Sequence, residues 1–598
     1  MRYSPLKQIN TANVSRLTHA WTYDLGGGNP RKRPSEVTPL VIGGVMYLTS
    51  PYAAVAAIDP ETGKEIWKYE IKQGGAPSTR GLVYWPGDKT SPPELLFGTS
   101  DGKLMALNAR TGQPVPGFGN EGVVDMRPGV ADNYPNRSYG LSSPPAVYKD
   151  IVITGAHVQE TPSLGPYADV RGWSAGAGKL LWTFHTVPRP GEPGSETWEG
   201  DSWKERSGTN VWGAMTVDAE RGMVFLPIGE PTTDFYGGDR RGANLYGSSL
   251  VALDATTGKV KWFFQTTHHD IFDYDLSAPP ALIEIARQGR KIPAVAQTTK
   301  QGLLFLFDRI TGAPIYGVEE RPVPQSDEPG EQTWPTQPFP LKPPPIARTS
   351  FRPDEVAKVT PEHQRFCEAI LAQGGGVQGG GPYQPYGTRL SLNFPGMFGG
   401  GNWGGVSFDP QLGYVFANTQ DLGTVFKVVA KREGANLQVT RVSPSGDVGG
   451  LSIGGFGGNM GVQFWNPDLS WPCVQPPWGR LVAVNANTGD IAWQAPLGEY
   501  EELTAKGVPR TGAPNIGGSI ATAGGLVFIG ATNDSRFRAF DSRTGKELWV
   551  TKIDASAHTV PVTYQGRNGK QYVVIMAGGG GIVGDHTVST SLTAFALP

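Results

Sequence analysis

The sequence predicts an all-β protein, an eight-bladed β-propeller, and three observations lead to this prediction. Glycine and proline are abundant, with 82 and 52 copies among 598 residues, and they follow no Gly-X-Y period. Such a chain has many turns and therefore many short strands. One turn phrase recurs along the chain. A strand-like segment also lies near each end, WTYDL and LTAFALP, and pairing them would close a ring without an open edge.

The recurring phrase is an apolar strand, a turn that mostly begins with Asp or Asn and ends in Gly, and a second strand that usually closes with Trp. Asp and Asn bond the backbone of their own turn and Gly supplies a positive φ, so the phrase is typical of a hairpin. We expect each Trp to pack one unit against the next, whereas a pair of β-sandwiches would not explain its repetition. The phrase occurs as AIDPETGKEIW (57–67), ALNARTGQPV (106–115), SAGAGKLLW (174–182), ALDATTGKVKW (252–262), LFDRITGAPI (306–315), AVNANTGDIAW (483–493) and AFDSRTGKELW (539–549), and two strands of an eighth unit as NWGGVSFDPQLGYVFANT (402–419).

The bulk composition excludes several classes of protein. Charged residues make up 18% of the chain and the formal net charge is −2, so we expect no nucleic-acid partner. No window approaches 18 uncharged apolar residues, and we therefore predict no membrane span. The two cysteines, Cys367 and Cys473, fit either one disulfide bridge or two buried thiols. The chain has no C-x-x-C-H motif for an attached haem.

One short segment concentrates ionisable residues. Residues 268–275, HHDIFDYD, follow the strand-like FFQTT. If the segment is extended, Asp273 and Asp275 point to one side, while Phe272 and Tyr274 pack on the other. A solvated turn would explain the acids, but not acids spaced two apart among large aromatic residues. The segment is therefore a candidate for chemistry.

Eight such units, five of them closed by Trp, resemble the quinoprotein dehydrogenases, which bind pyrroloquinoline quinone (PQQ) at the centre of a propeller. The opening RYSPLKQIN and the closing GGSIATAGGLVFIGATNDSRFRAFDSRTGKELW and NGKQYVVIMAGG are similar to the membrane-bound glucose dehydrogenase branch. The resemblance covers nearly the whole chain, but the membrane helices of that branch are lacking. It implies one propeller domain over residues 1–598, in which a Pro/Gly-rich insertion at 318–400 covers the active-site face and sets selectivity.

The resemblance also implies a set of cofactor-binding residues. Arg80, in TRGLVYW, matches the arginine that pairs with a PQQ carboxylate, and a planar guanidinium suits that contact. Trp212 matches the indole on which the PQQ ring stacks. The adjacent cysteines that the alcohol dehydrogenases carry upstream of the arginine are replaced by GGAPST, which favours the sugar and polyol branch. The candidate cofactor-binding residues are Glu36, Arg80, Ser143, Trp212, Lys300 and Asn402.

A metal site is implied by the same comparison. The family holds a cation against PQQ through hard oxygen ligands, and the matching residues here are Glu160, Glu230, Asp273 and Asp275. Glu230 departs from the asparagine of alcohol-oxidising relatives, and its alternative interpretation is a solvated loop acid. Lanthanide-using methanol dehydrogenases carry an acid at the position of Asp275. Calcium is the expected ion, and a lanthanide is the alternative.

The catalytic roles follow from the family. Asp273 is the expected base that takes the proton of the substrate hydroxyl while hydride leaves the same carbon. Lys300 and the cation are expected to polarise the quinone and stabilise charge on its oxygens. His268 and His269 either line the substrate entrance or are structural residues with satisfied ring nitrogens, and His157 is a further candidate to face the cofactor.

The expected function is the oxidation of a sugar or polyol hydroxyl, with electrons passed to an external cytochrome or quinone. The first alternative is a PQQ-dependent primary alcohol dehydrogenase that uses calcium or a lanthanide. The second is a non-catalytic propeller scaffold, which would need no central acid, base or stacking indole. MRYSPLKQIN lacks the regions of a signal peptide, and we expect a periplasmic or secreted protein from which the signal has been removed.

Overall fold

The protein is built almost entirely from β-strands in a computed structural model that describes residues 2–598 except 30–31, 73, 445–447, 450–461, 581–582 and 586. This confirms the all-β prediction. The longer helices are α1 (Pro361–Ala372) and α2 (Glu501–Ala505), and the 3-10 turns are η1 (Val14–Arg16), η2 (Ser195–Thr197), η3 (Pro353–Glu355) and η4 (Gln373–Gly375). Among the described residues, every helix is too short or too polar to span a bilayer.

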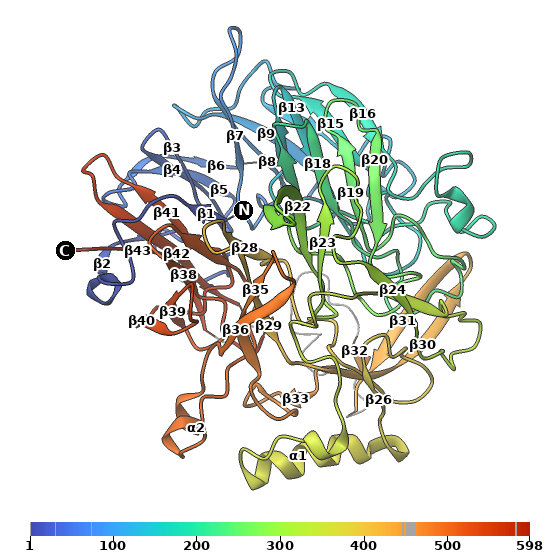
Figure 1. Cartoon of the computed structure of the whole chain (residues 1–598). Coiled ribbons are helices and arrows are strands. Elements are labelled where there is room, and N and C mark those ends of the chain that lie inside the picture. The colour runs from blue at the N-terminus through green and yellow to red at the C-terminus, as the bar shows by residue number, and fades with distance from the viewer. Residues whose placement is uncertain are drawn as a thin grey trace.

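Eight of the sheets follow one another along the described part of the chain, and Figure 1 shows them arranged around the molecule from blue through green to red. Their neighbouring strands are antiparallel, except for one parallel pair in the seventh sheet. The first four sheets contain β3 (Leu40–Ile42), β4 (Val45–Ser50), β5 (Ala54–Ile58) and β6 (Glu65–Glu70); β7 (Val83–Trp85), β8 (Glu94–Gly98), β9 (Lys103–Asn108) and β10 (Val123–Asp125); β12 (Ala146–Tyr148), β13 (Ile151–Thr154), β15 (Val170–Ser174) and β16 (Leu180–Phe184); and β17 (Thr216–Asp218), β18 (Met223–Pro227), β19 (Ser249–Asp254) and β20 (Val260–Gln265).

The last four sheets include the strands from both ends of the chain. They contain β21 (Ala281–Arg287), β22 (Arg290–Thr298) and β23 (Leu304–Asp308); β28 (Val406–Asp409), β29 (Tyr414–Gln420), β35 (Gly479–Asn485) and β36 (Asp490–Pro496); β1 (Tyr3–Ser4), β37 (Ser519–Thr522), β38 (Leu526–Ile529), β39 (Arg536–Asp541) and β40 (Glu547–Lys552); and β2 (Thr18–Asp24), β43 (Val588–Ala596), β42 (Gln571–Gly579) and β41 (Val562–Gln565). The N-terminal β2 pairs with the C-terminal β43.

The predicted turn chemistry is present at the recurring phrase. In the first sheet, the Asp59 side chain accepts hydrogen bonds from the backbone N–H groups of Glu61 and Thr62, at 2.8 and 3.0 Å. Gly63 closes the turn at φ +70°, a conformation that favours glycine because it has no Cβ. Local hydrogen bonding and backbone freedom therefore explain why the phrase forms a hairpin.

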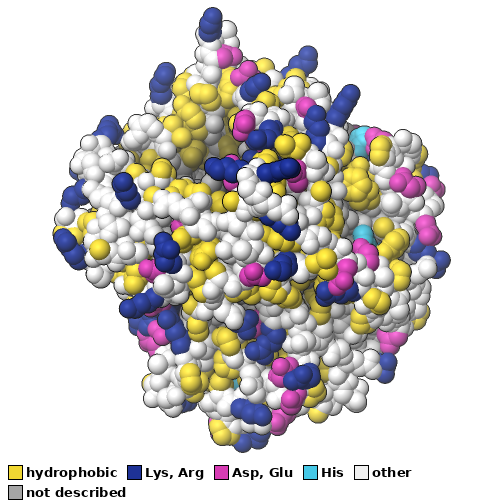
Figure 2. All heavy atoms as spheres, viewed as in Figure 1, with side chains coloured by type: hydrophobic (Ala, Val, Ile, Leu, Met, Phe, Trp, Pro, Cys, Tyr) yellow, Lys and Arg dark blue, Asp and Glu magenta, His cyan; other side chains and the backbone are white. Residues whose placement is uncertain are grey.

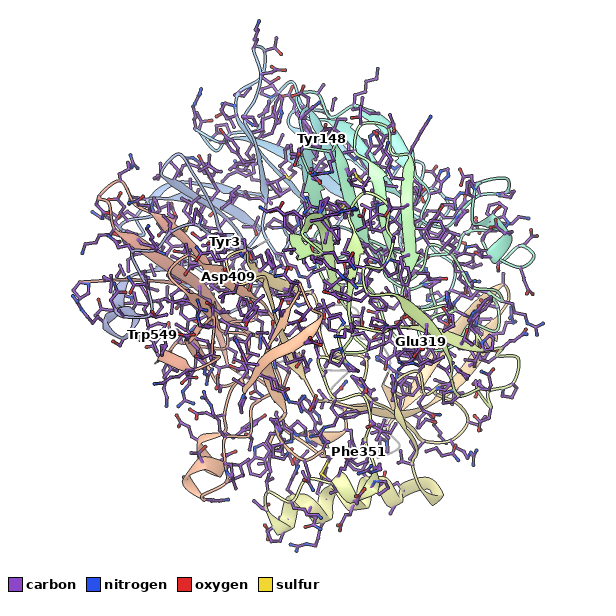
Figure 3. The ribbon with its side chains drawn as sticks, in the orientation of Figure 1. Tyr3, Tyr148, Glu319, Phe351, Asp409 and Trp549 are labelled. Carbon is purple, nitrogen blue, oxygen red and sulfur yellow. A yellow bond between two sulfur atoms is a disulfide. The ribbon has the colours of Figure 1, made fainter. Side chains whose placement is uncertain are left out.

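Most of the repeated tryptophans contact the turn of the next sheet. A Cβ atom on Gly63 would lie 2.8 Å from the ring of Trp21, whose Nε1 donates to the Pro60 carbonyl at 3.0 Å. Trp549, labelled in Figure 3, instead lies 5.3 Å from the ring of Phe595 in the neighbouring sheet. These are the contacts that the repeated tryptophan predicts. The glycine contact also joins Trp67 to Gly112, Trp182 to Gly258, Trp262 to Gly312 and Trp493 to Gly545.

Buried apolar side chains join neighbouring sheets. Tyr47 of the first sheet and Phe97 of the second belong to one cluster. Met46 of the first sheet and Met576 of the eighth belong to another. The other consecutive pairs of sheets share clusters of the same kind. The core is therefore divided into layers between sheets, and each layer depends on the sheets on both sides of it.

The insertion, residues 318–400, and the segments near it contain regular elements. Its helix α1 is bonded through Cys367 to Cys473, with 5.4 Å between the Cα atoms, which settles the question that the sequence left open. Phe351, which Figure 3 labels beside α1, packs in the same apolar cluster as the bridge. The additional strands are β24 (Val318–Pro322), β25 (Thr336–Pro340), β26 (Gln378–Gly381), β27 (Ser391–Asn393), β30 (Thr424–Glu433), β31 (Asn436–Val442), β32 (Val448–Gly449), β33 (Trp465–Asn466), β34 (Trp471–Pro472), β11 (Tyr139–Gly140) and β14 (His157–Val158).

Candidate functional site

A cavity of about 370 Å³ collects polar residues from distant parts of the chain. Apart from His157, Val158 and Gly579, the lining residues lie in connections between strands, where functional side chains commonly gather on a rigid framework. Ser143 is the one predicted site residue that does not line the cavity, and it lies directly behind Arg80. The predicted residues that do line it are Glu36, Arg80, Glu160, Trp212, Glu230, Asp273, Asp275, Lys300 and Asn402.

Arg80 forms one polar end of the cavity. Its Nε lies 3.0 Å from a carboxylate oxygen of Glu36, and its Nη1 donates to the Ser143 hydroxyl at 3.2 Å. The guanidinium carbon lies 5.2 Å from the ring centroid of Trp212 and 4.8 Å from that of Trp403. The cation is thus fixed between two indoles with part of its donor capacity facing the cavity.

The Trp212 indole is held at both ends. Its backbone carbonyl accepts hydrogen bonds from the hydroxyls of Ser142 and Ser143, at 3.0 and 2.6 Å. Its Nε1 donates to Asp275 Oδ2 at 3.0 Å. A ring restrained in this way presents a fixed flat surface to whatever enters the cavity.

The segment 268–275 is a loop, so the condition of an extended segment, on which the expected side-chain directions depended, is not met. Asp273 has φ +57°, a left-handed conformation that no feature of the residue pattern indicates. Asp273 and Asp275 nevertheless both reach the cavity. Phe272 and Tyr274 are buried as expected, but they pack in an aromatic cluster with Tyr383 and not on the opposite face of a strand.

Lys300 connects the two acids of this loop. Its Nζ donates to Asp273 Oδ1 at 2.5 Å and to the Asp273 carbonyl at 2.9 Å, and it lies 3.4 Å from Asp275 Oδ2. Burial alone would lower the pKa of Lys300, but the two carboxylates outweigh burial and raise it above its ordinary value. Lys300 therefore stays protonated.

The cavity holds more carboxylates than cations can balance. Burial raises the pKa of Asp273 to about 8, with Lys300 opposing the shift. Burial and neighbouring acids also raise the pKa of Glu230 and Asp234 well above the ordinary range, and loss of hydration inside the cavity raises the pKa of Glu160. The backbone N–H of Glu230 donates to Asp275 Oδ1 at 2.7 Å, so Glu230 belongs to the site and the solvated-loop alternative is wrong.

The comparisons with known proteins identify the family. The family model described as "PQQ: Glucose/ethanol/alcohol dehydrogenase, beta-propeller domain" matches residues 1–573. The chain belongs to the PQQ-dependent dehydrogenases. This quinoprotein is 34% identical to the quinate/shikimate dehydrogenase (quinone) of Acinetobacter baylyi, over 98% of this chain and 76% of that protein. It is 34% identical to the glycerol dehydrogenase large subunit of Gluconobacter oxydans, over 100% of this chain and 84% of that protein.

A solved relative has a similar backbone. The crystal structure of the quinohemoprotein alcohol dehydrogenase from Comamonas testosteroni matches with a TM-score of 0.70 and 25% identity, over 100% of this chain and 78% of that chain. These relatives are oxidoreductases that act on CH–OH donors. The quinoprotein is therefore an enzyme, and this membership excludes the non-catalytic scaffold.

The residues of the quinoprotein site fit the cofactor and the cation of the family. PQQ is planar and carries several carboxylates, and the cavity offers the Arg80 guanidinium beside the faces of Trp212 and Trp403. A hard cation prefers oxygen ligands, and the cavity supplies them in excess of positive charge. The oxygen donors facing the cavity are those of Glu160, Glu230, Asp234, Asp273 and Asp275.

Several residues of the quinoprotein site were not found from the sequence. Asp234 follows Glu230 by four residues in GEPTTDF, and that spacing is the one signal that could have indicated it. Trp403 was assigned only to a strand unit. Asn402 lines the cavity, but its side chain is bonded within its own turn, to Phe398 O at 2.8 Å and from Trp403 N at 2.7 Å.

The histidines occupy different positions. His157 lines the cavity, and loss of hydration there and the charge of Arg80 lower its pKa. His268 and His269 do not line it, and the ring nitrogens of both are bonded. The structural alternative therefore describes these two histidines better than a place at the substrate entrance.

Proposed function

We propose that this enzyme is a PQQ-dependent dehydrogenase that oxidises a sugar or polyol hydroxyl, with Asp273 as the base. The observation that carries the proposal is the Lys300–Asp273 pair, which lies beside Asp275 and the Trp212 indole in a cavity rich in carboxylates. A base, a fixed cation and a stacking surface within one cavity are the parts that such a reaction needs.

The chain's own residues would hold the cofactor on three sides. Trp212 would carry the ring on its face, and Arg80 would pair with a carboxylate of PQQ, with Glu36 and Ser143 keeping the guanidinium in place. Lys300 and Asn402 would lie near the quinone edge. When bound, PQQ supplies the acceptor for the hydride that leaves the substrate carbon.

The proton of the substrate hydroxyl goes to a carboxylate oxygen of Asp273. A buried carboxyl with a pKa of about 8 is a stronger base than an exposed one, provided that a nearby cation keeps it ionised. Lys300 favours the ionised form, and opposes the rise of the pKa, through its 2.5 Å contact with Oδ1. Its second contact, with the Asp273 carbonyl, fixes the backbone on which the carboxylate turns.

The proposed ligands of the cation are Glu160, Glu230, Asp273 and Asp275. Calcium is the proposed ion, since it accepts several carboxylates in a flexible geometry. A lanthanide is the alternative, and the additional carboxylate of Asp234 favours it because a trivalent ion balances more negative charge. Reconstitution of the metal-free protein with each ion separately decides between them.

The proposed architecture is an eight-bladed propeller in which each of the eight sheets is a blade. The pairing of β2 with β43 and the apolar cluster between the eighth and first sheets support closure of the ring. The insertion is proposed to cover the active-site face and set substrate selectivity. Met397 and Phe398, at its end, line the cavity and support this role.

The proposed substrate class rests on the relatives named for quinate or shikimate and for glycerol, which are both polyhydroxylated. A primary alcohol is the alternative, favoured by the alcohol dehydrogenase whose backbone is similar. Electrons are proposed to pass to an external cytochrome or quinone. A periplasmic or secreted location is proposed, supported by the Cys367–Cys473 bridge, because disulfides persist in oxidising compartments.

The test is reconstitution with PQQ plus calcium, or PQQ plus a lanthanide, followed by dye reduction with glucose, glycerol, quinate, ethanol and methanol. Turnover with a polyhydroxylated substrate supports the proposal. Turnover restricted to ethanol and methanol replaces it with the primary alcohol alternative. Absence of turnover with every substrate and both ions overturns it.

A further inference from the structure

His269 is buried in the loop that carries Asp273, and both of its ring nitrogens face oxygen acceptors. Nδ1 lies 2.8 Å from the Gly242 carbonyl and Nε2 lies 2.8 Å from Glu331 Oε1. Carbonyl and carboxylate oxygens accept hydrogen bonds, so both contacts are satisfied when each nitrogen donates, as in an imidazolium paired with the Glu331 carboxylate. The side chains of His269 and Glu331 are 0% and 1% exposed, so the two charges are paired away from water.

Glu331 belongs to the insertion and has a second fixed contact. Its Oε2 accepts a hydrogen bond from the Gly237 backbone at 2.5 Å. Burial opposes its ionisation, but the hydrogen bond and the charge of His269 hold the pKa of Glu331 below the ordinary value. The Glu331 carboxylate therefore connects the insertion both to His269 in the loop and to the backbone at Gly237.

Two further contacts bind the same loop to the insertion. The amide side chain of Gln337 accepts a hydrogen bond from His268 N and donates to His268 O, both at 2.8 Å. Tyr274 donates its hydroxyl to Asn393 Oδ1 at 2.8 Å and lies 5.4 Å from the ring of Tyr383. The insertion thus contacts the loop at its beginning and near its end.

This loop needs external support because its backbone is unfavourable. His269 and Asp273 both have positive φ, at +45° and +57°, and such residues persist only where the surroundings hold them. Inside the loop, Asp270 Oδ1 accepts a hydrogen bond from Phe272 N at 2.9 Å. Outside the loop, Ser248 bonds the Asp270 carboxylate at 2.6 Å and Arg240 bonds the Asp270 carbonyl. Glu331 and Gln337 are the contacts that the insertion adds at the start of the loop.

We propose that the insertion acts as a brace, meaning that it holds the catalytic loop, residues 268–275, in place. Within this brace, the His269–Glu331 ion pair positions the Asp273 carboxylate. The catalytic part rests on the proposed function, because it assigns the base to Asp273. Neither residue lines the cavity, so the pair acts through the loop backbone. The alternative is that the pair contributes only to the stability of the fold.

Glu331→Gln tests the brace with little change of shape. The amide can still accept from Gly237 N and donate to an uncharged imidazole, so the fold is retained while the ion pair is lost. Glu192→Gln is the matched control: Glu192 Oε1 lies 2.9 Å from His185 Nδ1 and Oε2 accepts from Arg189 N at 2.7 Å. This pair makes the same contacts far from the 268–275 loop in sequence, but its side chains are more exposed, at 33% and 42%.

Hydrogen–deuterium exchange of peptides covering residues 268–276 is measured without and with PQQ plus calcium. We expect faster exchange there in Glu331→Gln and no change in Glu192→Gln. With the reconstituted enzyme, we expect kcat to fall about 10- to 100-fold in Glu331→Gln, since small displacements of a catalytic group have effects of this size. KM and bound PQQ should stay close to the wild-type values. Gln337→Ala, a second variant, should change both readouts in the same direction.

The outcomes separate the brace from the proposed function. If the wild type turns over its substrate but Glu331→Gln and Gln337→Ala match Glu192→Gln in exchange and kcat, the brace is overturned. If exchange in Glu331→Gln rises and kcat falls only in proportion to a lowered Tm, the pair is structural and the proposal fails. If the wild type shows no turnover, the proposed function fails, and the exchange measurement alone still decides whether the insertion braces the loop.

Discussion

Lys300 and Asp273 are bonded twice, once through the carboxylate and once through the backbone carbonyl of the same aspartate. The ammonium therefore controls both the charge of the proposed base and the peptide unit that carries it. A base with one of these contacts could rotate away from its substrate. The double contact explains how a left-handed residue in a loop can serve a reaction that requires fixed geometry.

Removal of the Lys300 charge should disable the site without unfolding the protein. We expect Lys300→Gln to lower kcat at least about 100-fold, because the buried Asp273 carboxylate loses its counter-charge and its alignment. Lys342→Gln is the control, since Lys342 forms an exposed pair with Asp490 at 2.8 Å. Steady-state kinetics on both reconstituted variants measure the difference. Equal activity of the two variants would show that Lys300 has no catalytic part.

Asp273→Asn should separate binding from turnover. The amide keeps the volume of the side chain but cannot take the substrate proton at its carbonyl oxygen with useful strength. We expect bound PQQ to be retained and kcat to fall by several orders of magnitude. The absorption spectrum of the reconstituted variant reports the cofactor, and dye reduction reports turnover. Near-normal turnover would refute the assignment of the base.

Asp234→Asn should weaken binding of the cation although Asp234 was not among the predicted ligands. Neighbouring acids contribute to its raised pKa, which shows that negative charge is concentrated there. Removing one such charge from the surroundings of a metal site commonly reduces affinity about 10- to 100-fold. Isothermal titration with calcium measures this, with the exposed Asp468→Asn as control. An unchanged Kd would place Asp234 outside the electrostatic reach of the ion.

Gly258→Ala should destabilise the fold through the tryptophan contact. Gly258 has φ +71°, and a Cβ there would lie 2.5 Å from the Trp182 ring. We expect the free energy of unfolding to fall by about 2–5 kcal/mol, from backbone strain and overpacking together. Gly569 has φ +79° and open space where a Cβ would lie. Gly569→Ala should therefore lower the free energy of unfolding by only about 1–2 kcal/mol. Denaturant unfolding compares them, and equal losses would remove the packing component.

Glu94 should make stability depend on pH. Neither of its carboxylate oxygens has a hydrogen-bond partner among the described residues, and burial, assisted by Asp88, raises its pKa to about 7. Between the ordinary pKa of a glutamate and pH 7, Glu94 is protonated in the folded state but ionised in the unfolded state. Its contribution to stability therefore falls as pH rises through that range and levels off above it. Glu94→Gln should remove that component, seen as a smaller decrease in Tm from pH 5 to pH 8 than in the wild type. A parallel decrease in both proteins would contradict it.

The sequence was sufficient for features that depend on local chemistry. The Asp59–Gly63 turn and the Trp21 contact follow from residue types at fixed spacing, and the family motifs led to Arg80, Trp212 and Lys300. Features that depend on distant contacts were missed. Asp273 has a positive φ in contact with Lys300 and Glu230, which are distant in sequence, and no local pattern signals that conformation. The partners of His269 and the pairing of Cys367 likewise depend on the folded chain.

The bridge between Cys367 and Cys473 has a practical consequence for making this enzyme. It closes a stretch of chain that supplies Met397, Phe398, Asn402 and Trp403 to the cavity. A host whose cytosol keeps thiols reduced would produce protein without this bridge. The denatured chain would then be less constrained, and the loss of stability reaches about 4–5 kcal/mol for a closed loop of this length. Poor yield or weak cofactor uptake in such material would reflect the redox state of the expression host, and export to an oxidising compartment should restore both.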